Sequence, residues 1–312
     1  MKGIQTMKNE KHLFGSQIGT GITWALIAST LWGISGTVLQ FISQGQAIPA
    51  TWFLSVRTLG AGVILLALSL IKYGKRTFAI FKTPRLIGWL LAYAIFGLMA
   101  NLFTFYMSVQ TGNASAATIL QYLSPLFIVL GGILFLHEKP TQVDLITFGL
   151  ALIGVFLAIT HGDIHTLAIP LNALIWGILS GLTAAFYVVL PRPITREIPP
   201  MIVLGWALII ASVLFNLFHP VWVGVPALHG STILAIATVI LVGTILPFLA
   251  LLHASNFAPS SVISILDAVQ PVVTFILSLL FLNLKFNWVE CLGAIIVLIA
   301  IYILQRYRTE TD

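Results

Sequence analysis

The sequence predicts an all-α integral membrane protein, and three observations support this prediction. Hydrophobic residues make up 59% of the 312 residues, and charged residues make up only 8%. A water-soluble domain carries about a quarter charged residues, so most of this surface is expected to face lipid. Apolar stretches near the roughly 20 residues that a spanning helix needs follow one another with short connections. The third observation is that the chain contains the same unit twice.

The repeated unit is clearest in residues 113–144, which align without a gap with residues 259–290 when shifted by 146 positions. Pro125 then aligns with Pro271, and apolar runs follow both prolines. An internal repeat of this kind constrains the whole architecture.

Ten spans divide evenly between the two copies, so each copy has five. An odd number makes the second copy enter the membrane in the opposite direction from the first, as in many secondary transporters. We therefore expect two inverted five-helix repeats, residues 17–160 and 170–306, with cytoplasmic tails at residues 1–16 and 307–312. The ten expected spans are Ile18–Ile42, Thr51–Ile71, Leu86–Val109, Ala114–Leu136, Leu145–Thr160, Leu171–Leu190, Ile202–Phe218, Ile233–His253, Ser260–Leu282 and Val289–Gln305.

Small residues recur at every fourth position of the first and sixth spans. Such stripes let two helix backbones approach closely, which favours helix association in lipid. They are compatible with static packing and with a sliding interface. The stripes are Gly21, Ala25, Ser29, Gly33 and Thr37 in the first span, and Ala173, Gly177, Gly181 and Ala185 in the sixth.

The distribution of Lys and Arg predicts that both termini lie in the cytoplasm, because cytoplasmic loops of membrane proteins are enriched in these residues. With the N-terminus inside, 13 of the 15 cations fall on the inner side. Of the other two, Lys285 is on the outer side and Arg57 is within the second span. The inner cations are Lys2, Lys8, Lys11, Lys72, Lys75, Arg76, Lys82, Arg85, Lys139, Arg192, Arg196, Arg306 and Arg308.

Composition and motifs argue against several other classes of protein. The net charge of +6 is explained by membrane topology, so we expect no nucleic-acid partner. The single cysteine, Cys291, excludes an intrachain disulfide and a thiolate cluster. No His pair has metal-ligand spacing and no nucleotide-binding loop is present, so we expect no metal, no cofactor and no direct ATP drive. No nucleophile–base pair lies within a span, so we expect no enzyme activity. The first apolar run is too long for a cleaved signal peptide.

Three prolines mark expected helix breaks: Pro125, Pro271 and Pro247. Each removes a helical hydrogen bond and frees a backbone carbonyl one turn earlier, and matching breaks in two repeats point to a binding site. Lining a solute cavity and stabilising the kinks alone are the two interpretations. The expected solute-binding residues are Gln121, Tyr122, Ser124, Asp267, Gln270, Trp32, Asn101, Tyr106 and Arg57.

Asp267 is the one acidic residue deep in a span, and its repeat mate is Gln121. A buried carboxylate in a membrane is expected to face water, find a partner or hold a proton. A proton-coupling or cation-binding role and a structural role both remain open. Arg57 has three interpretations: it pairs with Asp267, binds an anionic part of the solute, or extends outward to the membrane surface.

Several motifs resemble those of the EamA-type ten-helix permeases of the drug/metabolite transporter superfamily. They are ASTLWG at residues 28–33, Arg57, ASAA at 114–117, Ser124-Pro125, LHEK at 136–139, GTILPF at 243–248 and Gln270-Pro271. The family often has a Glu before the span-nine proline and another after that span. This chain has Gln270, and then Asn283 and Leu284, at those places.

The resemblance implies export or exchange of small metabolites across a bacterial-type inner membrane. We expect a secondary transporter that works by alternating access, with proton coupling through Asp267 as one mechanism. A passive facilitator or exchanger is an alternative, and so is a membrane sensor or partner subunit that does not transport. The expected partners are the lipid bilayer and a small-molecule substrate. A homo-oligomer is compatible with the sequence.

Overall fold

A computed structural model describes residues 2–135, 137, 139–163, 167–258, 260–282 and 287–311. Within these ranges it describes all side chains except those of residues 2–17, 260–261, 264–265 and 308–311. Expected features at Glu138, Pro259 and Lys285 lie outside the described residues.

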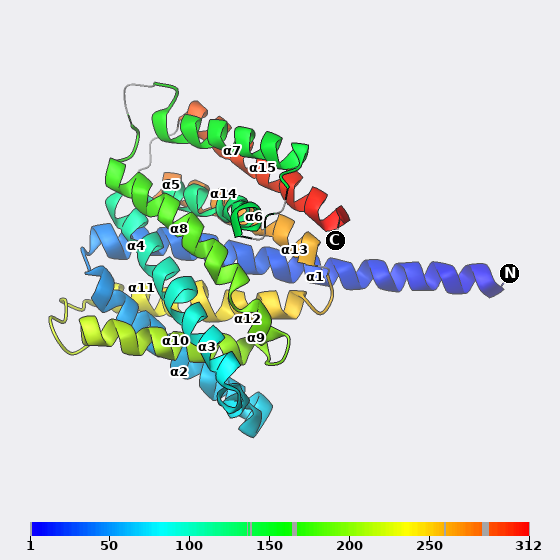
Figure 1. Cartoon of the computed structure of the whole chain (residues 1–312). Helices are drawn as coiled ribbons and strands as arrows, with labels where there is room; N and C mark the ends of the chain where they lie inside the picture. The colour runs from blue at the N-terminus through cyan, green and yellow to red at the C-terminus, as the bar shows by residue number, and fades with distance from the viewer. Residues whose placement is uncertain are drawn as a thin grey trace.

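The part of the chain that the structure describes is helical throughout, with no β-strand (Figure 1). The first half contains α1 (Lys2–Gln40), η1 (Phe41–Gly45), α2 (Ala50–Tyr73), η2 (Gly74–Lys82), α3 (Pro84–Ala92), η3 (Tyr93–Met99), α4 (Ala100–Thr111), α5 (Ala114–Gln121), α6 (Ser124–Phe135) and α7 (Gln142–Thr160). The second half contains α8 (Leu171–Val189), α9 (Arg192–Thr195), α10 (Pro200–Phe218), α11 (Gly230–Ile240), η4 (Leu241–Ile245), α12 (Leu246–Ala254), α13 (Ser260–Asp267), α14 (Val269–Phe281) and α15 (Trp288–Thr311).

These helices account for the expected spans. Nine helical segments of the described residues are long and apolar enough to cross a membrane, and the shorter apolar helix Val269–Phe281 lies where the ninth span is expected. The predicted class, an all-α membrane protein, is thereby confirmed. Helix α1 begins at Lys2, well before the expected start of the first span, so the segment predicted as a polar tail is helical from Lys2 onward.

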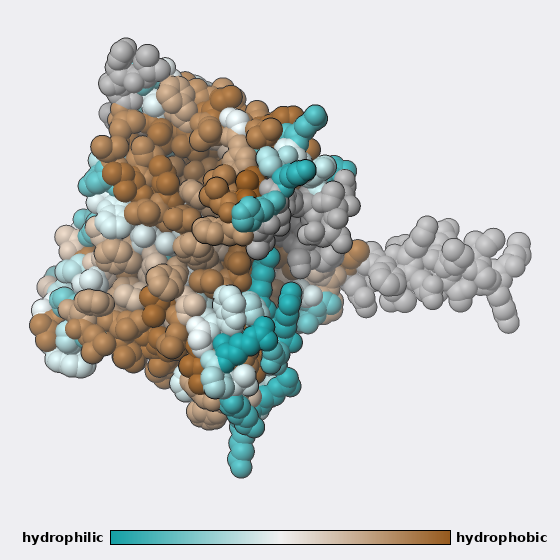
Figure 2. Space-filling model, in the orientation of Figure 1, coloured by the Kyte–Doolittle hydropathy of each residue, from teal (hydrophilic) through white to brown (hydrophobic). Residues whose placement is uncertain are grey.

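The outer surface is that of a protein surrounded by lipid. Large apolar side chains point outward on many helices; Leu152 on α7 and Leu234 on α11 are each 69% exposed. Figure 2 shows a largely hydrophobic face, with hydrophilic residues gathered toward the end from which α1 projects. Such a surface is stable against acyl chains, and in water it would be an aggregation hazard.

The helices pack in a regular set of pairs. Helix α2 packs on α10, and α7 runs beside α15 (Figure 1). Helix α1 packs against α12, α13 and α14 of the second half, while α8 packs against α4, α5 and α6 of the first half. The first helix of each half is therefore embedded among helices of the other half.

The small-residue stripes lie at these exchanged contacts. A Cβ added to Gly33 on α1 would lie 2.6 Å from the Cβ of Val273 on α14 and 2.9 Å from the carbonyl oxygen of Gln270. A Cβ added to Gly177 on α8 would lie 2.3 Å from Cδ1 of Leu120 on α5. Glycine at both positions allows the close approach that lipid alone does not drive.

Helix α7 begins with a reciprocal cap typical of helix N-termini. Thr141 Oγ1 accepts a hydrogen bond from the Asp144 amide, and Asp144 Oδ2 accepts one from the Thr141 amide. These bonds satisfy backbone donors that the helix itself leaves unpaired. Helix α5 starts in a similar way, with the side chain of Asn113 accepting from the Ala116 amide.

Three segments of the described chain, η1, η3 and η4, are π-helical, and two of them lie at matching places in the two halves. These are η3 in the third span and η4 in the eighth, and the 146-residue shift places η4 over the last part of η3. Single π-helical turns disturb the regular ladder of backbone hydrogen bonds and are frequent at functional sites.

The crossing of α7 and α15 generates a stability prediction. A Cβ on Gly154 would lie 2.7 Å from the Gly293 carbonyl oxygen and 2.8 Å from the Val297 amide nitrogen. Backbone atoms cannot rotate away, so Gly154→Ala should force the helices apart and lower stability by about 1–3 kcal/mol. Thermal unfolding of the purified protein in detergent measures the effect.

Gly149→Ala is the matched control, because it lies on the same helix and an added Cβ there meets nothing within 4 Å. It should leave the melting temperature unchanged or raise it. Equal melting temperatures for the two variants would contradict the close approach of α7 and α15.

Candidate functional site

Two spans are broken near their middle, one in each half. The fourth span is interrupted at Tyr122 and Leu123, between α5 and α6, and Pro125 is the second residue of α6. The ninth span is interrupted at Ala268, between α13 and α14, and Pro271 follows within the first turn of α14. The break in each half thus lies directly before its proline.

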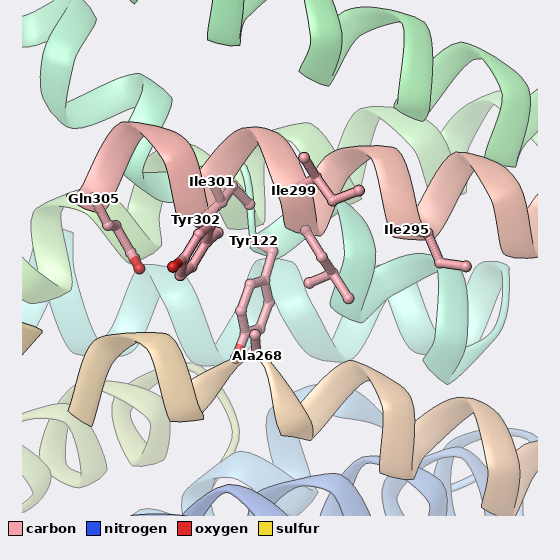
Figure 3. A pocket seen from close by; sticks show the side chains of 8 residues that line it. Tyr122, Ala268, Ile295, Ile299, Ile301, Tyr302 and Gln305 are labelled. Carbon is pink, nitrogen blue, oxygen red and sulfur yellow. The ribbon is translucent and has the colours of Figure 1, made fainter. Parts of the chain in front are cut away.

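The two breaks are joined by a hydrogen bond between the halves. Pro271 has no N–H, so the carbonyl of Asp267, four residues earlier, has no helical partner. The hydroxyl of Tyr122 donates to that carbonyl oxygen. Figure 3 shows Tyr122 pointing into the gap between α13 and α14, beside Ala268. A side chain from the first break therefore satisfies the backbone at the second.

Pro247 creates a second free carbonyl, that of Gly243 in η4. Arg57 on α2 meets it: Nη2 donates to the Gly243 oxygen at 3.3 Å, and Nε donates to Thr244 Oγ1 at 3.1 Å. Again the donor comes from the other half of the chain. The eighth span stays continuous at Pro247, because α12 follows η4 without interruption.

The carboxylate of Asp267 lies beside α1. Its Oδ1 accepts a hydrogen bond from Ser29 Oγ at 3.4 Å, and Ser29 belongs to the small-residue stripe. Asp267 itself is partly exposed, whereas Ser29 is buried. The printed hydrogen bond to the carboxylate thus comes from one neutral hydroxyl group, at the junction of α1 with the broken span.

Gln121, the repeat mate of Asp267, belongs to a separate polar cluster on α4, α5 and α8. Its Nε2 donates to Ser180 Oγ at 3.1 Å and to Asn101 Oδ1 at 3.4 Å. Asn101 Nδ2 in turn donates to the Ser180 carbonyl at 3.1 Å. Thr183 and Thr104 extend the cluster, with their hydroxyl oxygens 3.0 Å apart. Two of the expected site residues are therefore in direct contact.

Arg57 and Asp267 do not form an ion pair. Among the described residues, one basic and one acidic side chain lie within 4.0 Å of each other: His161 Nε2 is 3.3 Å from Glu290 Oε2. That pair joins the C-terminal end of α7 to the first turn of α15. Direct pairing of Arg57 with Asp267, one of the three interpretations of Arg57, is therefore not observed. Both side chains are hydrogen bonded to neutral groups instead.

The structure places Tyr106 away from the two breaks. Its ring is fully buried in the apolar core beside Phe53, and its hydroxyl donates to the Ile48 carbonyl at 2.6 Å. This hydrogen bond anchors the segment that connects η1 to α2, and we do not include Tyr106 in the site. The other expected residues, Trp32 on α1, Ser124 at the start of α6 and Gln270 on α14, are each partly exposed.

Sequence reasoning did not identify Tyr187 on α8 or Tyr93 in η3. The two ring centroids lie 5.6 Å apart. The register that aligns Trp24 with Trp176 aligns Tyr187 with Ser35 of α1, which lies outside the small-residue stripe.

An apolar crevice opens beside the second break, between that break and α15. Its walls are formed by Tyr122, Ala268, Ile295, Leu298, Ile299, Ile301, Tyr302 and Gln305 (Figure 3). The backbone break next to Asp267 is therefore reached from an apolar surface. No group of three or more His, Cys, Asp or Glu side chains that could hold a metal ion occurs in the described part of the chain.

These features define a polytopic helical membrane protein with paired helix breaks and buried polar groups between its halves. The chain belongs to the EamA-like transporter family, which matches residues 19–160 and again residues 171–306.

Three comparisons illustrate its relatives. The chain is 32% identical to the uncharacterized inner membrane transporter YicL of Salmonella typhimurium, over 91% of this chain and 95% of YicL. It is 25% identical to protein RarD of Salmonella typhi, over 92% and 97% of the two chains. A crystal structure with 16% identity covers 96% of this chain and 99% of its own, with a TM-score of 0.61, which supports the fold.

The bond between the breaks predicts an effect on stability. Tyr122→Phe keeps the ring but leaves the Asp267 carbonyl without its donor in a region that lacks bulk water. We expect the free energy of unfolding to fall by about 1–3 kcal/mol. Thermal unfolding in detergent micelles measures the change. Tyr302→Phe, on the opposite wall of the same crevice, serves as the matched control and should leave stability within about 0.5 kcal/mol. A smaller loss for Tyr122→Phe than for Tyr302→Phe would argue against the bond.

Proposed function

We propose that the protein is a secondary transporter of a small organic solute in a bacterial-type inner membrane, working by alternating access. The observation that carries the proposal is the hydrogen bond from Tyr122, at the break of one half, to the Asp267 carbonyl, at the break of the other. Membership of the EamA-like transporter family supports the class, and the printed name of YicL supports the membrane.

The proposed architecture is a pair of inverted five-helix repeats, residues 17–160 and 170–306, with both termini in the cytoplasm. The helix contacts support it, because they exchange under repeat equivalence: α1 packs on α12 to α14 as α8 packs on α4 to α6. The pairs α2–α10 and α7–α15 each join equivalent spans. A twofold axis in the membrane plane would produce this pattern.

In the proposed mechanism the solute binds where the broken spans meet, and the two halves rock around it. The residues assigned to the site are Asp267, Tyr122, Gln121, Ser124, Gln270, Asn101, Trp32 and Arg57. Pro125 and Pro271 lie at the two breaks, and Pro247 lies in the continuous eighth span. Asp267 exchanges a proton or binds a cationic group, because the hydrogen-bond donor to its carboxylate, Ser29, is neutral. A passive facilitator without proton coupling is the second candidate, favoured by Gln at position 270, where the family often has Glu.

The first experiment tests transport itself. A thermal-shift screen of purified protein against amino acids, nucleosides, amines and quaternary ammonium compounds identifies a solute, which is then followed in proteoliposomes. A transporter gives protein-dependent flux. A membrane sensor or partner subunit binds without flux, and that outcome would contradict the proposal.

Asp267→Asn separates proton coupling from passive exchange. The amide keeps the size of the side chain and its contact with Ser29 but carries no titratable proton. We expect proton-driven accumulation of the solute to vanish while counterflow exchange survives. Glu197→Gln, which removes an exposed carboxylate near α9, is the control and should leave both activities intact. Accumulation that persists in Asp267→Asn would favour the facilitator.

The orientation is tested with single cysteines in a Cys291→Ser background. Asp163→Cys, after α7, should react with a membrane-impermeant thiol reagent added outside intact cells. Arg76→Cys, in η2, should react only after the cells are opened. The reverse pattern would contradict the cytoplasmic placement of the termini and the positive-inside reasoning behind it.

A further inference from the structure

The apolar crevice beside the second break is lined mainly by one side of α15. Residues that recur at intervals of three or four lie on the same side of a helix, and the crevice is lined by Ile295, Leu298, Tyr302 and Gln305. Ile295 and Tyr302 are 51% and 41% exposed, so the crevice is continuous with the outer surface of the protein. Figure 3 shows α15 on one side of it and the broken span on the other, with Tyr122 between them.

The repeat explains why the crevice lies at the second break. The 146-residue shift aligns Tyr122, at the first break, with Ala268, at the second. The Tyr122 side chain is large enough to reach the Asp267 carbonyl, whereas Ala268 carries a single methyl group. The small residue leaves space between the second break and α15, and Ala268 lines that space.

The dimensions of the crevice suit a hydrocarbon chain. Its volume is about 250 Å³, below the roughly 300–1,000 Å³ of pockets for drug-sized ligands. From Ile295 to Gln305 its wall runs about 15 Å along α15, at 1.5 Å per residue. This length is half of the hydrocarbon core of a bilayer, which is about 30 Å thick. The crevice is therefore as long as one leaflet and too small for a bulky solute.

The chemistry of the walls favours the same occupant. Apolar cavities stay dry, because a water molecule needs several polar partners to enter. An empty crevice would lose the dispersion contacts of its wall atoms. Acyl chains surround this exposed side of α15 in the membrane, so one of them can fill the space without loss of hydrogen bonds.

The polar end of the crevice matches the position of a lipid head group. Gln305 lies close to the end of the tenth span, which extends to Tyr307, and Ile295 lies nearer its middle. Tyr302 and the exposed Arg306 are of the types enriched where a span meets the membrane surface. Arginine at this level also attracts the phosphate of a lipid. In the proposed orientation, this end of α15 is at the cytoplasmic surface.

We propose that the crevice binds one acyl chain of a phospholipid from the cytoplasmic leaflet, and that this chain closes the second break toward the membrane. The chain lies against the ring of Tyr122 and keeps water away from the hydrogen bond between Tyr122 and the Asp267 carbonyl. The choice of leaflet rests on the proposed orientation. The site for the chain does not depend on which solute is transported.

Photolabelling of the full-length protein tests the inference. The protein is reconstituted in vesicles of phosphatidylethanolamine and phosphatidylglycerol, and a small fraction of the phosphatidylglycerol carries a photoactivatable diazirine in one acyl chain. Mass spectrometry of peptides then locates the labelled residues. We expect residues 295–305 of α15 to be labelled severalfold more strongly than residues 149–159, which are their repeat equivalents on α7. The α7 segment is a fair reference, because it also exposes large apolar side chains, such as Leu152.

Two variants fill the crevice from opposite walls. Leu298→Trp enlarges a side chain of α15, and Ala268→Tyr introduces at the second break the residue type found at the first. Each should lower the labelling of residues 295–305 severalfold, so the test stays decisive if one of them does not fold. Leu152→Trp is the matched control: it places the same substitution at the repeat-equivalent position of α7 and should leave the labelling of α15 unchanged.

Four outcomes would overturn the inference. Equal labelling of the two helices would mean that the lipid beside α15 is ordinary boundary lipid. Labelling of α15 that persists in both filled variants would place the chain elsewhere. Displacement of the label by the solute found in the screen would assign the crevice to an apolar part of that solute. A wild-type dimer with unlabelled α15 that dissociates in Leu298→Trp would assign it to a second copy of the chain. Flux of the solute tests the proposed function separately.

Discussion

The structure depends on one constraint: a backbone carbonyl within a bilayer must find a donor in the protein, because no bulk water is present to supply one. Pro271 frees the carbonyl of Asp267, and Pro247 frees that of Gly243. In both cases the donor comes from the opposite half, from Tyr122 and from Arg57. The two freed carbonyls therefore act as points of attachment between the two halves. Breaking either hydrogen bond leaves a carbonyl oxygen without its donor. The free-energy cost of this loss depends on which group replaces the donor.

This arrangement suits a protein that must change shape between two states of similar free energy. A hydrogen bond to a freed carbonyl contributes about 1 kcal/mol net when a second donor can replace it, and much more when none can. In the proposed transport cycle, a solute or a water molecule entering between the halves would supply such a donor. The bond from Tyr122 would then be exchanged at small net cost, so the attachment that holds the resting structure would also be the contact that a bound solute releases.

Much of the fold could be predicted from the sequence because lipid simplifies the problem. The apolar stretches predicted the spans, and the 146-residue repeat placed Pro125 over Pro271, directly behind the two observed breaks. The extension of α1 back to Lys2 was not predicted, because its residues 2–16 are polar and hydropathy reports only burial in lipid. The π-helical segments were also missed, since their cause is a local change in hydrogen bonding that has no composition of its own.

The site was harder to predict, because depth along a span does not determine direction around it. Gln121 and Asn101 are in contact as a shared cluster would require, yet Tyr106 on the same helix as Asn101 faces the core and donates to the Ile48 carbonyl. Tyr187 was missed because the helices that pack against α8 belong to the first half of the chain, far away in the sequence. A repeat aligns residues that are equivalent by symmetry, whereas a site between repeats is built from residues that are not. The ring contact of Tyr187 with Tyr93 follows from the packing of α8 against η3, which no linear alignment of the two halves contains.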